Sequence, residues 1–353
     1  MTKEVICRDI RIGGDSPISI QSMTNTQTAN FAATIEQINR LKDAGCQIFR
    51  MAINDVEAAE ALRIIRKAVD VPLVADIHFD YRLAIESMKN GVDKIRINPG
   101  NIGDKNRVKA VVDVAKERNI PIRIGINGGS LERDILKKYG EVTPEALVES
   151  AIRNVEIVEN LNYDNLVISV KSSNVLMNHQ AYRLLSKKTE YPLHIGLTEA
   201  GYSTSGIIKS SVALGSLLME GIGDTMRVSL TGDPVQEIKV AKEILYASGK
   251  RKAPIEVISC PTCGRTHGDL EKYVKQLNKA IEQKNHLFVQ RKPFTIAIMG
   301  CEVNGPGEAK EATYGIAYGK KVAVIFKKGK PAKKVKEEEA IDNLIDMIVE
   351  EKE

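Results

Sequence analysis

The sequence predicts a TIM (β/α)8 barrel followed by a smaller α+β domain that carries a metal site. From about residue 18, short β-rich runs alternate with stretches that have apolar residues at helical spacing, and eight such pairs fit in roughly 250 residues. The composition then changes, and the polar, basic stretch 248–254 ends in a proline and is typical of a linker. We therefore expect a barrel over 1–247 and a second domain over 255–353.

The eight expected barrel strands are short runs rich in β-branched residues: 18–24, 48–53, 72–77, 94–98, 121–127, 166–171, 193–199 and 225–231. Helices are expected between them, for example over 34–43, 56–69 and 144–159, where Thr143 and Pro144 form a typical helix start. An open doubly wound sheet is the alternative, but no Gly-rich phosphate loop opens any of these helices. Residues 3–17 are expected to form a small hairpin that caps one end of the barrel.

The second domain is expected to contain strands over 255–258, 294–299, 314–318 and 322–327, with helices over 269–284 and 337–351. Lysines are dense from 320 to 336. The simpler interpretation of this stretch is a solvated hairpin and linker. The alternative is a docking face for an acidic electron-carrier protein.

Composition excludes several classes of protein. A net charge of +5 over 353 residues, with no Trp and six Phe, argues against a nucleic-acid binder. The first residues lack the apolar core of a signal peptide, and no window of about 18 residues is apolar throughout, so we expect a cytoplasmic protein with no membrane partner. In that reducing compartment, the five cysteines favour metal or redox chemistry over disulfides.

Polar side chains gather where the expected barrel strands end, which is the end at which TIM barrels form active sites. The four cations among them are Arg50, Arg96, Arg123 and Lys171; the other polar residues there are Asn54, Asp76, His78, Asn98, Asn127, Glu199 and Ser229. Cations at one mouth repel each other unless an anion lies between them, and arginine suits bidentate contact with phosphate. The pattern predicts a phosphorylated substrate, although each cation paired with a neighbouring carboxylate is the simpler alternative.

Glu199, in the run HIGLTEAG, is the notable carboxylate at this mouth. It could stabilise charge, protonate a leaving hydroxyl, or form a salt bridge with Lys171 or Arg123. Asp76 and His78 could orient other side chains or contact the substrate directly.

Two pieces of the second domain predict the metal site. The run ISCPTCGRTHGD places Cys260 and Cys263 in a C-x2-C pair, and MGCEVNGPGE adds Cys301. Cys7 and Cys46 are expected to be buried small side chains, so the fourth ligand is Glu308, Glu302, His267 or no protein group. Spacing alone leaves zinc and an iron–sulfur cluster open.

The motifs then carry a resemblance across nearly the whole chain: RMAI, KIRINPGN, RIGINGGSL, VISVKSSN, HIGLTEAG, RVSLTGDP, ISCPTCGRT and MGCEVNGPGEA. The chain resembles the bacterial two-domain 4-hydroxy-3-methylbut-2-enyl diphosphate synthases of the non-mevalonate isoprenoid pathway. The resemblance implies a sulfite-reductase-like second domain with a [4Fe–4S] cluster held by Cys260, Cys263, Cys301 and Glu308. It also implies reductive ring opening and dehydroxylation of 2-C-methyl-D-erythritol 2,4-cyclodiphosphate, with flavodoxin or ferredoxin as electron donor.

The resemblance further implies a head-to-tail homodimer in which the cluster of one subunit closes the barrel mouth of the other. Glu199 would act as the acid. The residues implied to contact the substrate are Arg50, Arg96, Arg123, Asn127, Lys171, Thr198, Ser229, Arg265, Thr266 and Asn304. The competing hypotheses are a barrel hydrolase or transferase with a structural zinc domain and a non-enzymatic metal-binding or docking protein. Iron–sulfur chemistry suits the reductive reaction because zinc has no redox chemistry.

Overall fold

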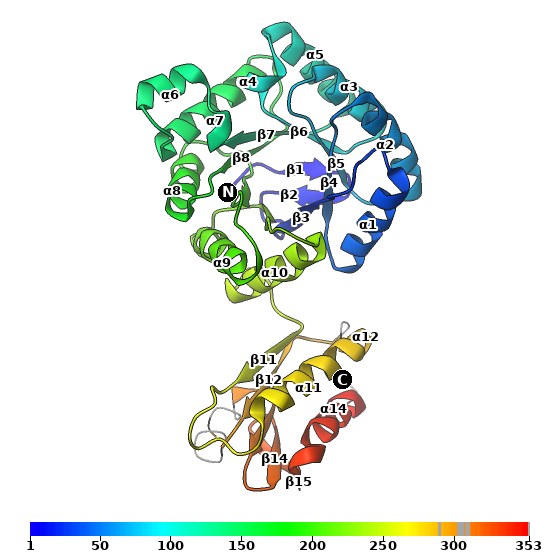
Figure 1. Cartoon of the computed structure of the whole chain (residues 1–353), viewed down its shortest axis with the longest axis vertical. Coiled ribbons are helices and arrows are strands. Elements are labelled where there is room, and N and C mark those ends of the chain that lie inside the picture. Colours follow the sequence, from blue (N-terminus) through cyan, green and yellow to red (C-terminus); the bar gives the residue numbers. More distant parts are fainter. Residues whose placement is uncertain (289–290, 302–306, 308–310, 352–353) are drawn as a thin grey trace. The chain divides into compact units, whose positions relative to one another are not determined.

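The computed structural model describes residues 1–288, 291–301, 307 and 311–351 of the chain. It divides into two compact units, Met1–Arg251 and Lys252–Glu353 (Figure 1).

The first unit is a closed parallel barrel, as the sequence predicts. Its eight-stranded sheet has the order β8-β7-β6-β5-β4-β3-β10-β9. A parallel bridge between Ile168 and Leu193 joins β8 to β9, and Ile168 N donates to Pro192 O at 3.0 Å. The strands are β3 (Ser19–Met23), β4 (Ile48–Ala52), β5 (Leu73–Asp76), β6 (Lys94–Ile97), β7 (Ile122–Asn127), β8 (Leu166–Lys171), β9 (His194–Gly196) and β10 (Thr225–Arg227).

Helices surround this barrel and bury their apolar faces against it (Figure 1). Several begin at polar caps; at α7 the Thr143 hydroxyl accepts from Ala146 N at 3.1 Å and Pro144 follows, as predicted. The helices are α1 (Phe31–Asp43), α2 (Val56–Ala68), α3 (Tyr81–Lys89), α4 (Pro99–Ile102), α5 (Lys105–Arg118), α6 (Arg133–Tyr139), α7 (Pro144–Glu159), α8 (Val175–Ser186), α9 (Ser203–Met219) and α10 (Pro234–Ala247), with a 3-10 turn at Gly128–Ser130.

An antiparallel hairpin of β1 (Val5–Cys7) and β2 (Ile10–Ile12) covers the end of the barrel where the strands begin, which confirms the predicted cap. Its buried Val5, Cys7 and Ile12 pack with Ile48, Val74 and Val167, residues in the early part of β4, β5 and β8. Apolar contact closes this end, so the polar mouth lies at the other end of the strands.

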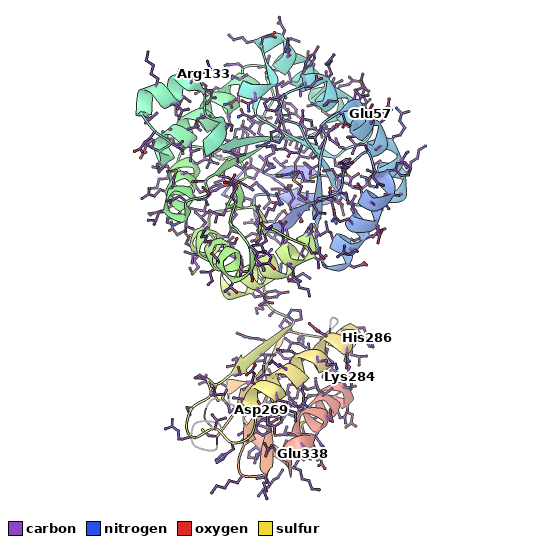
Figure 2. All side chains as sticks on the ribbon, viewed as in Figure 1. Glu57, Arg133, Asp269, Lys284, His286 and Glu338 are labelled. Carbon is purple, nitrogen blue, oxygen red and sulfur yellow. The ribbon has the colours of Figure 1, made fainter. Side chains whose placement is uncertain are left out.

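The second unit is a five-stranded mixed sheet in the order β11-β12-β13-β14-β15. Helices α11 (Leu270–Gln283) and α14 (Ala340–Glu350) share one apolar core with the sheet. Asp269, labelled in Figure 2, caps α11 by accepting from Lys272 N at 3.0 Å. The strands are β11 (Ile255–Ser259), β12 (Phe294–Met299), β13 (Tyr314–Tyr318), β14 (Val322–Lys327) and β15 (Lys330–Lys336); α12 (Asn285–Phe288) and a 3-10 turn at Glu337–Glu339 complete the described elements.

Strand β15 corrects the sequence prediction, which treated 330–336 as solvated linker. The stretch pairs antiparallel with β14, although all its residues except Val335 are exposed. An edge strand with one free side needs little apolar character, and its lysines discourage pairing with another chain. Hydrophobic alternation is therefore weak in 330–336, and the sequence pattern does not predict a strand there.

Across the part of the chain that the structure describes, each helix is too short or too polar to cross a membrane.

Candidate active site

A small polar cavity lies at the barrel mouth. Its volume is about 100 Å³. The side chains that line it come from strands all round the barrel: Arg50, Asp76, His78, Arg96, Arg123, Asn127, Ser169, Lys171, Thr198, Arg227 and Ser229. The four predicted cations thus meet in one place, and Arg227 joins them.

The strand register explains why these groups converge. Asp76 on β5 pairs in register with Arg96 on β6, which pairs with Arg123 on β7. These three residues therefore occupy one level of the barrel. Arg123 is the second residue of β7, four residues before Asn127, so it lies further from the mouth end of the strand. Asn127 is in register with Lys171 of β8.

Asp76 is the carboxylate that the cations share. It lies 3.3 Å from Arg96 Nη1, 3.6 Å from Arg50 Nε and 3.4 Å from His78 Nε2. Burial alone would raise the pKa of Asp76, but Arg50, His78, Arg96 and Arg123 outweigh burial and hold that pKa well below its usual range. Asp76 thus orients two arginines as an anion, the indirect role that the sequence left open beside direct substrate contact.

Arg123 and Lys171 have no such partner among the described residues. Arg123 is 1% exposed and donates from Nη1 to Ser169 Oγ at 3.3 Å, while its Nε and Nη2 are buried with no acceptor in the described structure. Lys171 is buried and forms no salt bridge with a described residue. Burial, followed by the neighbouring arginines, lowers the pKa of each of these groups well below its ordinary value. The cavity is therefore built for an anion that the protein does not supply.

Two glycines make room for these long side chains. A Cβ added to Gly125 would lie 2.5 Å from Arg96 Nε, and one added to Gly196 would lie 2.5 Å from Lys171 Nζ. Arg96 also donates from Nη2 to Gly125 O at 3.1 Å. Close approach of a side chain to the backbone requires glycine at both positions.

Arg227 at the end of β10 is a cavity residue that sequence reasoning missed. Its guanidinium pairs with the buried Glu237 of α10, with Nη2 to Oε1 at 3.2 Å. Met23 Sδ accepts from Arg50 Nη2 at 2.8 Å and lies 3.8 Å from Arg227 Nη1, so a thioether separates two cations. Its position in the sequence could have indicated this role, because Arg227 is a cation at the end of a strand, two residues before the predicted Ser229.

The remaining predicted mouth residues differ in placement. Asn127, Thr198 and Ser229 line the cavity, whereas Glu199 is exposed and does not line it. Glu199 has a left-handed backbone with φ of 53°, an uncommon conformation for a side chain-bearing residue. It forms no ion pair with another described residue, so the salt-bridge alternative with Lys171 or Arg123 is wrong for this structure.

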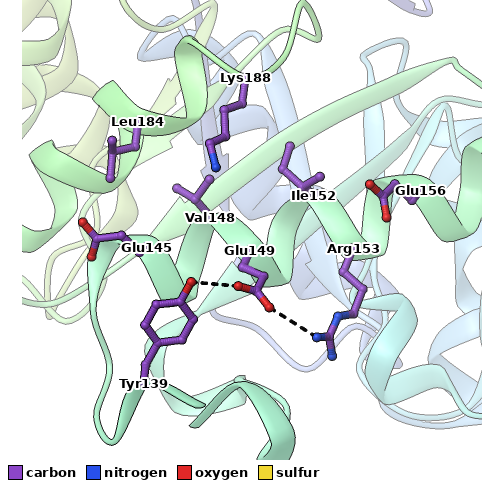
Figure 3. A pocket seen from close by; sticks show the side chains of 9 residues that line it. All are labelled: Tyr139, Glu145, Val148, Glu149, Ile152, Arg153, Glu156, Leu184 and Lys188. Carbon is purple, nitrogen blue, oxygen red and sulfur yellow. Dashed lines mark hydrogen bonds and ion pairs between the residues drawn. The ribbon is translucent and has the colours of Figure 1, made fainter.

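A larger groove on the outer helices has a different character. It measures about 610 Å³, and Figure 3 shows its apolar floor of Val148, Ile152 and Leu184. Its central charges are paired: Glu149 accepts from the Tyr139 hydroxyl at 2.7 Å and lies 3.5 Å from Arg153. The other charged lining residues, Glu145, Glu156 and Lys188, are exposed. Unpaired buried charge, rather than volume, distinguishes the mouth cavity as the candidate active site.

In the second unit, hydrogen bonds to Gly300 join the two cysteine-bearing pieces, and a further bond orders the first piece. Cys260 follows β11, and its Sγ accepts from Gly300 N at 3.2 Å. His267 N donates to Gly300 O at 2.7 Å, and Cys263 N donates to Thr266 Oγ1 at 2.9 Å. Cys260, Cys263 and Cys301 therefore belong to one end of the sheet, the end where parallel β11 and β12 finish.

The thiols differ in a way that suits metal binding. A hydrogen bond from the Arg265 backbone, together with Thr266 and the Arg265 charge, lowers the pKa of the exposed Cys263. Burial raises the pKa of Cys7 to about 11 and of Cys46 to about 12, so these two are inert buried side chains, as predicted. Soft thiolates fit an iron–sulfur cluster or zinc.

The described residues contain no group of three or more His, Cys, Asp or Glu side chains close enough to hold a metal ion. The candidate ligands Glu302 and Glu308 and the candidate substrate residue Asn304 lie outside the described residues. Arg265 and Thr266 lie in the cysteine loop of the second unit and are not among the residues that line the barrel cavity.

Comparison with known proteins gives the family. Residues 2–242 match the model of the GcpE TIM-barrel domain, and residues 256–350 match that of the GcpE protein C-terminal domain. The chain belongs to the GcpE family. As a GcpE protein it is 57% identical over 344 residues to a protein of Clostridium acetobutylicum, covering 98% of this chain and 97% of that one. It is 55% identical over 345 residues to one of Caldanaerobacter subterraneus, covering 98% and 96%. Both relatives are named 4-hydroxy-3-methylbut-2-en-1-yl diphosphate synthase (flavodoxin).

Among solved structures, the GcpE chain is similar to dihydropteroate synthase of Yersinia pestis, with a TM-score of 0.50 and 12% identity. The match covers 70% of this chain and all of that one. At this identity the likeness concerns the fold alone and supports the TIM barrel.

Proposed function

We propose that this GcpE protein converts 2-C-methyl-D-erythritol 2,4-cyclodiphosphate to 4-hydroxy-3-methylbut-2-enyl diphosphate. The reaction breaks the ring carbon–oxygen bond and the carbon–oxygen bond of a hydroxyl, consumes two electrons and one proton, and releases one water. The observation that carries the proposal is the mouth cavity, in which five cations face one lining carboxylate, Asp76. Arg50, Arg96, Arg123, Lys171 and Arg227 are these cations.

The diphosphate would supply the missing negative charge. Arg123 and Lys171 are buried and lack a carboxylate in the described structure, so an anion between them relieves both their desolvation and their mutual repulsion. Asp76 holds Arg50 and Arg96 in place before the substrate arrives. Asn127, Thr198 and Ser229 add neutral hydrogen-bonding groups to the same wall. Fixed cations of this kind stabilise charge that develops on the departing ring oxygen.

Glu199 is proposed as the acid. Glu199 follows the cavity-lining Thr198 on the left-handed turn after β9 and does not itself line the cavity, which supports a position outside the cationic cluster. From there a carboxylic acid can deliver a proton to the departing hydroxyl, which leaves as water. Keeping the acid outside the cationic cluster also avoids a permanent ion pair that would compete with the diphosphate.

Cys260, Cys263 and Cys301 would hold a [4Fe–4S] cluster, with Glu308 as a replaceable fourth ligand. The soft thiol donors and the hydrogen bonds that join their two segments support this assignment. When bound, the cluster supplies electrons singly and acts as a Lewis acid. Arg265, Thr266 and Asn304 are proposed to contact the substrate from this side.

The assembly and surroundings are proposed as follows. The protein acts in the cytoplasm as a head-to-tail homodimer, so that the cysteine-bearing unit of one subunit closes the barrel mouth of the other. Flavodoxin is the electron donor, consistent with the names of the relatives, and ferredoxin is the alternative donor.

Anaerobic purification followed by iron, sulfide and zinc analysis tests the proposal. We expect a brown protein with about four irons per chain that turns over the cyclic diphosphate with a strong chemical reductant. Glu308→Ala is expected to weaken cluster binding, and Glu199→Gln to retain the cluster and lose turnover. A colourless protein with one zinc would instead favour a barrel hydrolase or transferase with a structural zinc domain. Native turnover by Glu199→Gln would remove its role as the acid.

A further inference from the structure

The β14–β15 hairpin and the turn before it form the most lysine-dense stretch of the chain. Residues 320–336 contain lysines at 320, 321, 327, 328, 330, 333, 334 and 336 and no Asp or Glu. All of these lysines except the half-buried Lys327 are exposed. The stretch is a strand edge, and lysines are common protection for such an edge. The position of some of these lysines near the cysteines suggests a second role besides protection of the strand edge.

The sheet topology places two ends of this hairpin in different surroundings. Strands β11, β12 and β13 are parallel, and two successive antiparallel pairings make β15 run the same way as β13. Cys260 and Cys301 follow the ends of β11 and β12, so Lys336, at the end of β15, belongs to the same end of the sheet. The turn that carries Lys320 and Lys321 between β13 and β14 also lies at this end.

Register and contacts agree with this placement. Met299 pairs with Ala317, Ala317 with Val324, and Val324 with Lys334, which spans three strand spacings or about 14 Å. Glu337, the residue after Lys336, accepts a hydrogen bond from the Tyr273 hydroxyl. The Glu337 carboxylate also occupies the space that a Cβ on Gly268 would take, so the end of β15 touches the cysteine loop 260–268.

Lysines at the other end of the hairpin have different neighbours. Lys327 pairs in register with Lys330 at the tip, and Lys327 Nζ lies 2.9 Å from Glu351 Oε1. Lys328 reaches the same carboxylate at 3.9 Å. Lys320, Lys321 and Lys336 form no salt bridge with any residue in the described ranges, and the same holds for Lys330 at the tip. Three lysines without a salt bridge therefore lie at the cysteine end, where Lys336 is followed directly by the acidic turn Glu337–Glu339.

We propose that Lys320, Lys321 and Lys336, with Lys334 beside them, form the docking face for the electron-donor protein, which presents an anionic surface around its redox group. The inference rests on the proposed function, because it assumes that electrons enter through the cysteine-bearing end. Exposed lysines steer an acidic partner to this end and raise the association rate without fixing a rigid complex. Rapid exchange suits a donor that must return for the second electron.

Two charge-reversal variants of the intact, cluster-loaded protein test the location. Lys320→Glu/Lys336→Glu changes the cysteine end, and Lys328→Glu/Lys330→Glu changes the tip by the same total charge. Turnover is measured with reduced flavodoxin and, separately, with a small chemical reductant at several salt concentrations. Binding of flavodoxin is measured by calorimetry, which needs no turnover.

We expect Lys320→Glu/Lys336→Glu to raise KM for flavodoxin by about tenfold at low salt and to weaken its binding similarly. The rate with the small reductant should stay at the wild-type level, and the tip variant should change KM by less than about twofold. Equal effects of the two variants, no effect of either, or an equal loss with both reductants would overturn the docking face. If the wild-type protein turns over with neither donor, the proposed function fails, and the calorimetric comparison still decides the docking face.

Discussion

Lys171 and Arg123 are held in the barrel without the negative charge that would stabilise them. Their buried state is unfavourable in the isolated protein, because each is desolvated among like charges. The same arrangement favours a diphosphate, since binding removes the repulsion. Stability and ligand binding are therefore in opposition at these residues.

Replacing Lys171 with Met should separate the two effects. Removal of the buried charge is expected to raise the free energy of unfolding of the metal-free protein by about 1–3 kcal/mol. Turnover should fall by about 100-fold, and pyrophosphate should no longer raise Tm as it does in the wild-type protein. Thermal unfolding with and without pyrophosphate measures the change in stability and the change in the pyrophosphate response, and a turnover assay measures the loss of activity. The exposed Lys187→Met variant is the control. A destabilised Lys171→Met protein that still responds to pyrophosphate would contradict the anion site.

Lys94 provides a pH test inside the barrel. It is fully buried, its Nζ has no acceptor among the described residues, and burial lowers its pKa from 10.5 to about 8. Between these values the unfolded chain binds the proton and the folded chain releases it, so this group makes stability rise with pH. From pH 7 to 11, wild-type stability relative to Lys94→Met should increase on the order of 3 kcal/mol.

The difference between the two proteins is the relevant measurement, from urea unfolding at a series of pH values. Buried Cys7 and Cys46 have raised pKa values and oppose the trend above pH 9 in both proteins. A difference that stays constant, or that decreases with pH, would show that Lys94 titrates normally in the folded chain.

Sequence reasoning found the cations at the mouth because charged residues at strand ends conflict with an apolar barrel core. It missed Arg227, although a cation at the end of β10 conflicts with an apolar core in the same way. It missed Met23 because a methionine fits an apolar strand; only the closed barrel brings Met23 between Arg50 and Arg227. It also placed Arg123 at a strand end, whereas register sets Arg123 level with Arg96 near the start of β7. Contacts between distant strands depend on register, which one sequence does not specify.

At the scale of elements, the barrel strands were predictable to within a few residues because buried β-branched runs alternate with amphipathic helices. Strand β9 is shorter than predicted, His194–Gly196 rather than 193–199, since the chain turns into the left-handed Glu199 soon after the strand ends. Strand β15 was unpredictable for the opposite reason, because an exposed edge carries almost no hydrophobic pattern.

Glycines within the strands also test the site. Gly196→Ala is expected to displace Lys171 while the barrel stays folded, because its Cβ would meet the flexible end of that side chain and the Arg227 carbonyl at 3.0 Å. The pyrophosphate-induced rise in Tm should fall by at least half, and stability should drop by about 1–3 kcal/mol.

Gly215→Ala on α9 is the matched control, since its Cβ would meet nothing within 4 Å. This variant should be more stable by about 0.5–1 kcal/mol with an unchanged response to pyrophosphate. An unchanged response in Gly196→Ala would mean that the space beside Gly196 is not needed by Lys171.

At the scale of the whole molecule, each unit has its own apolar core. All residues that line the mouth cavity belong to the first unit, and all three candidate cysteine ligands belong to the second. Anion binding and metal binding are thus assigned to separate bodies, and only turnover requires both.

A fragment of residues 1–251 should therefore fold and bind pyrophosphate without the second unit. We expect a cooperative thermal transition and a pyrophosphate-induced rise in Tm equal to that of the full chain, because the lining residues are all retained. The fragment should show no turnover. A folded fragment that ignores pyrophosphate would place part of the anion site in the second unit.

Because the hairpin of β1 and β2 closes one end of the barrel, the cavity can be entered only from the mouth. The apolar side chains of Val5, Cys7 and Ile12 close the end of the barrel where the strands begin, so molecules cannot pass through the barrel. Whatever enters between Arg50 and Lys171 must leave by the same route. Product must therefore leave before the next substrate can bind, because a product that stays in the cavity blocks the only route of entry.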